Sequence, residues 1–193
     1  AQKREQIRAQ IRESMSAGQG AARAPPLEPK NPPPLAVLDQ GVNEVYLWHG
    51  CCASSLWSIV RQGFDERLAK GCFYGSGVYF APQACKAMQY ARAEGCSLRD
   101  KTCHSLYCRC PGPKYLLYCR VVLGVPFYPP EMMRQLRRPP INDATGLTYD
   151  SIVANPGIVT LGGKSQTHRE IVVWNHCGAQ AYPEYIVKLD TAP

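Results

Sequence analysis

Apolar and polar positions along the chain predict short strands interleaved with short helices. Apolar runs predict five strands, over 45–48, 77–81, 115–124, 170–174 and 185–189. Helical spacing predicts helices over 54–61 and 84–92, with Ser54 or Ser55 as N-cap of the first and Gly63 as its stop. Because the elements do not follow the regular spacing of βαβ units, we expect an α+β fold.

The N-terminal part of the chain differs from the rest. Residues 2–15 have helical character, and residues 16–34 are rich in Gly, Ala and Pro, with successive prolines at 32–34. Such a composition is typical of an extended linker. We therefore expect a basic helical and Pro-rich tail or linker over 1–35, followed by a folded domain over 36–193.

Length, charge and cysteine content narrow the class of protein. The chain has 193 residues and a formal net charge of +7, which favours acidic partners or serves only solubility. No apolar run approaches the roughly 20 residues needed to cross a bilayer, and no signal peptide is visible. Ten cysteines would suit a secreted disulfide scaffold, but many lie outside any cluster. We expect a reduced, intracellular protein, cytoplasmic or nuclear.

Glu170 is a candidate catalytic carboxylate. It precedes a β-branched run, and a strand is a rigid mount on which Glu170 and Val172 share a face. A carboxylate beside a ribose stabilises the positive charge that develops when the bond from the sugar to its leaving group breaks. An exposed glutamate at a strand end, without catalytic role, explains the same pattern.

Other side chains fit a site for a flat ligand that carries a ribose. His49 can hydrogen-bond a ribose hydroxyl, and Gly50 leaves its backbone open to close approach by a carboxamide. Tyr79 and Tyr90 offer two aromatic faces between which a ring can stack. A structural histidine and core tyrosines are the ordinary alternatives, and the residue pattern leaves both open.

Three segments, taken in this order, are similar to the catalytic core of the poly(ADP-ribose) polymerase family. They are LWHG at 47–50, YGSGVYFA at 74–81 and EIVVW at 170–174. The resemblance runs from about Asn43 to Leu189, and within the family the chain is most similar to the tankyrase-like type. Further segments that carry it are GFDER at 63–67, LLYCRV at 116–121 and AYPEYI at 181–186.

The resemblance implies an ADP-ribosyltransferase fold, with two packed, mainly antiparallel sheets and short helices around an NAD cleft. It implies a glycosyltransferase that cleaves the nicotinamide–ribose bond of NAD+ and transfers ADP-ribose to protein acceptors, with or without elongation to poly(ADP-ribose). The residues it assigns to catalysis are His49, Tyr79 and Glu170. Those it assigns to NAD+ binding are His49, Gly50, Asp65, Tyr79 and Tyr90.

Two positions depart from the family pattern. Ala87 stands where the family commonly has a serine that holds the nicotinamide amide, so a hydrogen bond worth about 0.5–1.5 kcal/mol is lost. Leu68 stands where tankyrases have a histidine near the adenine. We therefore expect weakened NAD+ binding. The alternative function is a catalytically weak module that binds NAD, ADP-ribose or a protein on the same fold.

A cysteine-rich insertion over 93–114 is a candidate metal site. Its possible ligands lie within fifteen residues and are Cys96, Cys103, His104, Cys108 and Cys110. Four thiolate or imidazole ligands form the usual structural zinc set, and free loop cysteines are the alternative. Tankyrases hold zinc in this insertion, so the resemblance implies structural Zn2+. Arg99 stands where tankyrases have a ligand histidine, and Cys103 or His104 would replace it.

The expected partners follow from the same features. We expect protein substrates and further domains of a longer parent chain, and no membrane partner. A zinc-organised nucleic-acid-binding domain is a third reading, which would use Arg134, Arg137 and Arg138. Because these arginines are spread over loops, we do not expect this domain to bind nucleic acid directly.

Overall fold

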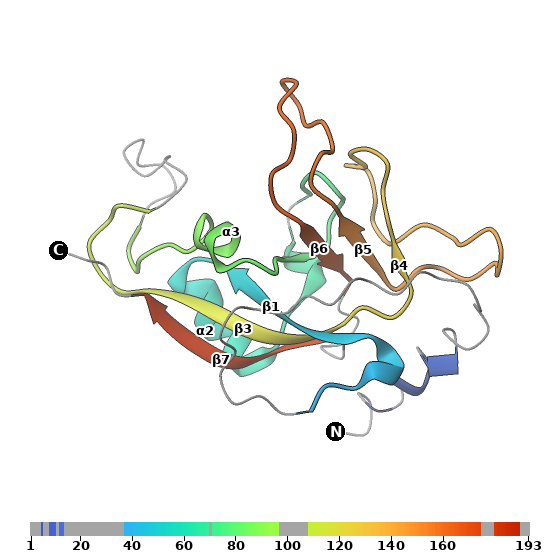
Figure 1. Ribbon diagram of the computed structural model, residues 1–193. Helices are drawn as coiled ribbons and strands as arrows, with labels where there is room; N and C mark the ends of the chain where they lie inside the picture. The colour runs from blue at the N-terminus through green and yellow to red at the C-terminus, as the bar shows by residue number, and fades with distance from the viewer. Residues whose placement is uncertain are drawn as a thin grey trace.

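The computed structural model describes residues 5, 8–10, 12, 13, 37–69, 71–96, 108–174 and 180–189. Within these residues two β-sheets and short helices form the α+β fold that the sequence predicts (Figure 1). Among the same residues, no helix combines the length and the apolar character that a membrane span requires.

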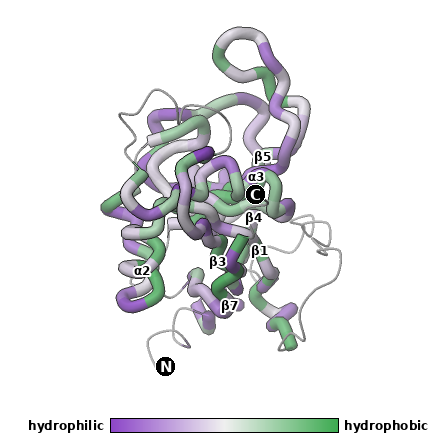
Figure 2. Tube along the Cα trace, turned by 90° about the vertical axis from the view of Figure 1, so that its left-hand side faces the viewer, coloured by the Kyte–Doolittle hydropathy of each residue, from purple (hydrophilic) through white to green (hydrophobic). Residues whose placement is uncertain are grey.

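The first sheet has three antiparallel strands in the order β1-β3-β7. They are β1 (Glu44–Gly50), β3 (Lys114–Val122) and β7 (Ala181–Leu189). The central strand β3 is buried along most of its length because it has a neighbour on each side and a core beneath it. Figure 2 colours the chain by hydropathy, and green hydrophobic segments lie beside the β3 label.

The second sheet has four strands in the order β2-β6-β5-β4. They are β2 (Val78–Phe80), β4 (Pro126–Phe127), β5 (Ser151–Ala154) and β6 (Glu170–Val173). All its pairs are antiparallel except β4 with β5, which is parallel. The predicted mainly antiparallel sheets are therefore confirmed, with one parallel pair added. The loop between β5 and β6 projects away from the sheet (Figure 1).

A shared hydrophobic core joins the two sheets. Leu47 and Leu117 of the first sheet belong to one buried cluster with Phe80, Ile171 and Val173 of the second. Burial of each such side chain contributes about 1.5–3 kcal/mol. The packing fixes the C-terminal end of β1 against β2 and β6, and these three strands border the site described below.

Helix α2 (Ala53–Gln62) ends at Gly63 as predicted, where a φ of 84° favours glycine. The predicted N-cap is wrong, because the N-cap residue is Cys52 and its side chain makes no capping hydrogen bond. Ser54 and Ser55 lie in the first turn instead, and their hydroxyls contact the Cys52 sulfur at 3.3 and 3.1 Å.

Helix α3 (Ala84–Met88) is shorter than the predicted helix over 84–92. The N–H groups of Tyr90 and Ala91 bond to carbonyls three residues back, which tightens the chain into turns. The next N–H, from Arg92, then bonds to the carbonyl of Cys51 at 3.2 Å and draws the chain away from the helix.

The remaining short elements were not predicted. They are the 3-10 turns η1 (Gln40–Val42) and η2 (Glu66–Leu68) and the strands β4 and β5. The two-residue strand β4 is too short to show a period. Strand β7 begins four residues before the predicted strand over 185–189, at Ala181, which pairs with Val121.

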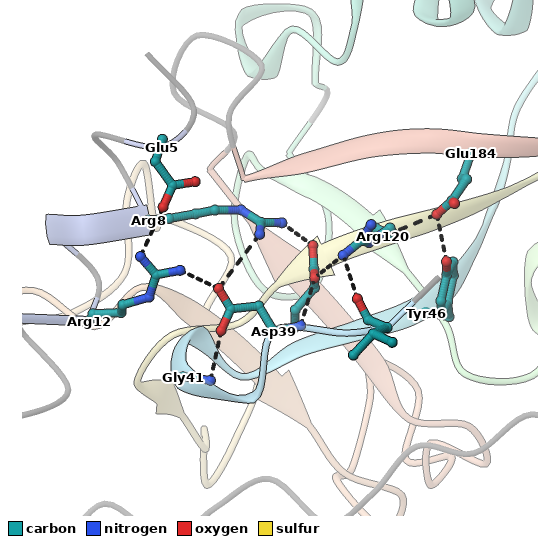
Figure 3. Close-up of polar contacts among 10 residues, drawn as sticks. Glu5, Arg8, Arg12, Asp39, Gly41, Tyr46, Arg120 and Glu184 are labelled. Carbon is teal, nitrogen blue, oxygen red and sulfur yellow. Dashed lines mark hydrogen bonds and ion pairs between the residues drawn. The ribbon is translucent and has the colours of Figure 1, made fainter. Parts of the chain in front are cut away.

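The described N-terminal residues are helical, as predicted, and they contact the first sheet (Figure 3). Arg8 pairs with the buried carboxylate of Glu44 on β1, and Arg12 pairs with Asp39. Arg120 on β3 donates to the same Glu44 carboxylate at 2.5 Å. Two guanidinium groups thus compensate a charge that would be costly to bury alone. The boundary at residue 35 stays a prediction, because residues 14–36 lie outside the described part of the chain.

Candidate functional site

A cavity of about 790 Å³ opens between the two sheets and the short helices. Its walls come from the end of β1, from α2, from the segment 62–72, from β2 and α3, and from the first residue of β6. This volume lies in the range of pockets that bury small molecules and cofactors. The predicted site residues that line it are His49, Gly50, Asp65, Tyr79, Tyr90 and Glu170.

His49 lies near the end of β1 and presents one ring nitrogen for binding. Its Nδ1 lies 2.8 Å from the carbonyl oxygen of Tyr79, so the proton on Nδ1 donates to that carbonyl. Burial lowers the pKa of His49 more than the Tyr79 hydrogen bond raises it. The imidazole is therefore neutral, and Nε2 is left as a hydrogen-bond acceptor.

Gly50 permits the close approach of α3 to β1. A Cβ built on Gly50 would lie 1.9 Å from the carbonyl oxygen of Ala87, which is backbone and cannot move aside easily. Only glycine fits at this position. Ala87 itself is 3% exposed and lines the cavity without a hydroxyl group.

The hydroxyl of Tyr79 forms hydrogen bonds with the backbone of the loop that precedes β2. The hydroxyl donates to the carbonyl of Gly75 at 2.9 Å and accepts from the N–H of Tyr74 at 2.9 Å. Burial raises the pKa of this phenol, so the proton stays on the oxygen. Because the hydroxyl is engaged with the loop, Tyr79 offers the cavity mainly the face of its ring.

Glu170 is the first residue of β6 and is buried, with 4% of its surface exposed. Its Oε1 lies 2.6 Å from Nζ of Lys86 on α3. The alternative of an exposed glutamate at a strand end is therefore wrong. A buried carboxylate paired with an ammonium group in a cavity is an arrangement typical of functional sites.

Lys86 is a cavity residue that the sequence reasoning missed. Burial lowers its pKa, but the hydrogen bond and charge of Glu170 outweigh burial, and the pKa is raised. The ammonium also donates to the Tyr90 hydroxyl at 3.3 Å and lies 5.3 Å from the centre of that ring. The spacing of four residues between Lys86 and Tyr90, next to a helix, is the signal that points to this contact.

Asp65 also lines the cavity. Its carboxylate accepts from Nε and Nη2 of Arg67 at 2.8 and 2.7 Å and from the Arg67 backbone N–H at 3.0 Å. These hydrogen bonds lower the pKa of Asp65. Leu68 is 78% exposed and also lines the cavity.

Comparison with known families identifies the class of this domain. The chain matches the family model of the poly(ADP-ribose) polymerase catalytic domain over residues 30–139, which is more than half of its length. The matched region contains His49, Gly50, Tyr79 and Tyr90 and ends before Glu170. The chain therefore belongs to the poly(ADP-ribose) polymerase catalytic-domain family, whose activity is ADP-ribosyl transfer with NAD+ as substrate.

Three cysteines of the insertion come together beside Ala93. The sulfur atoms of Cys96, Cys108 and Cys110 all lie within 4.8 Å of one another. The Cys96 and Cys108 sulfurs are 3.5 Å apart, far beyond disulfide length and close to the separation of about 3.8 Å that tetrahedral zinc thiolates require. Cys103 and His104 lie outside the described residues.

Two further cysteines, Cys51 and Cys119, lie outside this cluster and pack among apolar side chains. Cys119 on β3 is fully buried, and Cys51 is half-buried beside the cavity. Burial raises the pKa of the Cys51 thiol to about 12. Both are free thiols, and burial keeps them protonated at neutral pH.

Proposed function

We propose that this protein cleaves the nicotinamide–ribose bond of NAD+ and transfers ADP-ribose to protein acceptors. The observation that carries the proposal is the buried Glu170–Lys86 pair in a cavity that His49, Tyr79 and Tyr90 also line. A carboxylate, an imidazole and two aromatic rings are the groups that a dinucleotide with a flat cationic ring requires. Family membership supports the same substrate.

The proposed binding mode follows from the walls of the cavity. The nicotinamide ring lies against Tyr79 and Tyr90, and its carboxamide bonds to the backbone of Gly50. Nε2 of neutral His49 accepts a hydrogen bond from a ribose hydroxyl. Asp65 and the exposed Leu68 lie on the adenosine side of NAD+.

In the proposed reaction, Glu170 acts on the ribose. The bond between C1 of the ribose and the nicotinamide nitrogen breaks, and its electron pair neutralises the departing ring. Positive charge develops on the sugar, where a fixed carboxylate in a water-poor site stabilises it. The acceptor oxygen then bonds to C1, and its proton passes to Glu170 or to solvent. Lys86 holds the carboxylate in place before the sugar arrives.

We further propose elongation to poly(ADP-ribose), by a tankyrase-like member of the family. A carboxylate that can orient one ribose hydroxyl in NAD+ can also activate the hydroxyl of a growing polymer. The support is the burial of Glu170, which keeps its charge available to a sugar rather than to bulk water. Product length on a denaturing gel distinguishes polymer from a single transferred unit.

We propose that Cys96, Cys108 and Cys110 hold a structural Zn2+, with Cys103 or His104 as the fourth ligand. The support is the clustering of three sulfur atoms at a spacing that suits zinc. The ion would tie the insertion to the start of β3, which begins four residues after Cys110. Two further expectations stay predictions: that the substrates are proteins, and that the protein is located inside the cell.

A second candidate function is a binding module without turnover. Ala87 favours it, because the cavity lacks a hydroxyl where the nicotinamide amide would bind. Calorimetry with NAD+, run beside an assay of nicotinamide release, separates the two functions. Binding without release would support the module, and release would exclude it.

The decisive experiment incubates the protein with labelled NAD+ and compares Glu170→Gln. The amide keeps the shape and loses the charge, so NAD+ binding should persist while nicotinamide release falls at least a hundredfold. Glu184→Gln on β7 is the matched control, because its carboxylate contacts the Tyr46 hydroxyl at 2.6 Å outside the cavity. Full activity of Glu170→Gln would contradict the mechanism.

A further inference from the structure

A hydrogen bond between two buried side chains joins the loop before β2 to the loop before β6. The hydroxyl of Tyr74 donates to Oε1 of Gln166 at 2.5 Å. Tyr74 is fully buried and Gln166 is 8% exposed, so water does not compete for this bond. Neither residue is among those that line the cavity. Any influence of the pair on catalysis must therefore act through other residues.

Gln166 closes the base of the loop that leads into Glu170. Its Nε2 donates to the carbonyl of Ala154 at 3.2 Å and to the carbonyl of His168 at 2.7 Å. Ala154 ends β5 and pairs directly with Glu170 on β6. The backbone N–H of Gln166 also bonds across the loop, where it donates to the carbonyl of Ile158 at 2.8 Å. One side chain thus fixes both ends of the loop beside the carboxylate.

Tyr74 lies in the loop that leads into β2, and it holds that loop in place. Its backbone N–H donates to the Tyr79 hydroxyl at 2.9 Å, and that hydroxyl donates to the carbonyl of Gly75 at 2.9 Å. The Tyr74 ring packs in a buried cluster with Val172 and Trp174 of the second sheet. A continuous set of hydrogen bonds therefore runs from Tyr79, through Tyr74, to Gln166.

We propose that Tyr74 and Gln166 are positioning residues for ADP-ribosyl transfer. The pair acts together with the β2–β6 ladder to hold the ring of Tyr79, against which nicotinamide lies, at a fixed distance from the carboxylate of Glu170, which faces the ribose. This inference rests on the proposed function. The bond that breaks joins nicotinamide to ribose, so its two halves must be held in one geometry. Displacement of a reacting group by about 1 Å can cost about a hundredfold in rate.

The test measures kcat and KM for nicotinamide release with Tyr74→Phe. This variant keeps the packed ring and removes the hydroxyl, which leaves Oε1 of Gln166 buried without its donor. We expect kcat to fall about tenfold while KM for NAD+ changes less than about threefold, because Glu170 acts in the transition state. In the Gln166→Met background, Tyr74→Phe should lower kcat less than about twofold further, because its partner is already absent.

A matched control separates positioning from loss of stability. Tyr118→Phe removes another buried tyrosine hydroxyl, on β3 and not among the residues that line the cavity, and should leave kcat unchanged. All assays are run well below the lowest Tm of the set. If Tyr74→Phe does not fold, kcat of the Gln166→Glu variant tests the inference instead. Its carboxylate still accepts from Tyr74 but cannot donate to Ala154 and His168, so kcat should fall in a folded protein.

Each result has a defined meaning. A kcat for Tyr74→Phe equal to that of the unmodified protein would overturn the inference, as would an equal loss in Tyr118→Phe. A fall in kcat that is fully additive with Gln166→Met would also overturn it. If the unmodified protein releases no nicotinamide, the proposed function fails and this inference with it. If the unmodified protein releases nicotinamide and the variants have the same kcat, only the positioning role is excluded.

Discussion

Nζ of Lys86 lies 2.6 Å from Oε1 of Glu170, and both side chains are largely buried, with 14% and 5% of their surfaces exposed. The two residues come from α3 and β6, which are far apart in the sequence. In water such a pair contributes little, but in a buried cavity each charge depends on the other. The pair therefore holds the Glu170 side chain in one orientation inside the cavity before substrate binds.

Replacement of Lys86 by Met should lower kcat/KM for NAD+ by about tenfold to a hundredfold. The variant leaves the Glu170 carboxylate buried without its cation, which also destabilises the fold by about 3–5 kcal/mol. Lys86→Arg should retain part of the activity because it keeps the charge. Nicotinamide release and Tm are the measurements, with the exposed Lys188→Met as control. Unchanged kcat/KM in Lys86→Met would show that Glu170 does not need the pair.

Introduction of a hydroxyl at position 87 should tighten NAD+ binding. Ala87 lines the cavity beside Gly50, and a serine hydroxyl there would supply the hydrogen bond to the carboxamide that the chain lacks. A gain of about 0.5–1.5 kcal/mol corresponds to a Kd lower by about twofold to tenfold. Calorimetry of Ala87→Ser with NAD+ and with nicotinamide alone tests this, and Ala87→Val, which adds bulk without a donor, should weaken binding. An unchanged Kd would place the carboxamide elsewhere.

The sequence predicted the parts of the molecule that local pattern determines. The central strand β3 and the Gly63 stop of α2 follow from apolar runs and from the conformational freedom of glycine. The predicted N-cap of α2 was wrong because the sequence does not distinguish a serine in the first turn from a serine at the cap. Lys86 and Gln166 were missed because their roles arise from contacts across 84 and 92 residues, which no local period records.

Removal of zinc, or of one ligand, should destabilise the insertion rather than change the chemistry. Cys108 is buried, and its sulfur lies 3.5 Å from that of Cys96. Because structural zinc couples binding to folding, Cys108→Ser or a strong chelator should lower Tm by several degrees and release about one zinc per chain. Metal analysis and thermal unfolding check this, with the exposed Cys85→Ser as control. Purified protein that contains no zinc, and whose Tm does not change on addition of the chelator, would contradict the assignment of a zinc site.

Asp150 makes the stability of the fold depend on pH. It lies against the turn that follows β3, where its Oδ2 accepts from the N–H of Val125 at 2.8 Å. Gly124 adopts a φ of 57° there, and a Cβ on it would lie 2.3 Å from the same oxygen. Burial raises the pKa of Asp150 to about 6, against the smaller opposing effect of the Val125 hydrogen bond.

The sign of this dependence follows from where the proton binds more tightly. Between pH values of about 4 and 6 the folded protein holds a proton on Asp150 that the unfolded chain has lost, so stability falls as pH rises through this window. Above it the buried charge costs up to about 3 kcal/mol. Asp150→Asn removes the charge and keeps an oxygen that can accept from Val125. We expect the variant to be more stable than the unmodified protein by about 1–3 kcal/mol near pH 7.5 and nearly equal to it near pH 4. Urea unfolding at both pH values measures the difference, with the exposed Asp143→Asn as control. A difference that is the same at both pH values would mean that Asp150 does not titrate in this window.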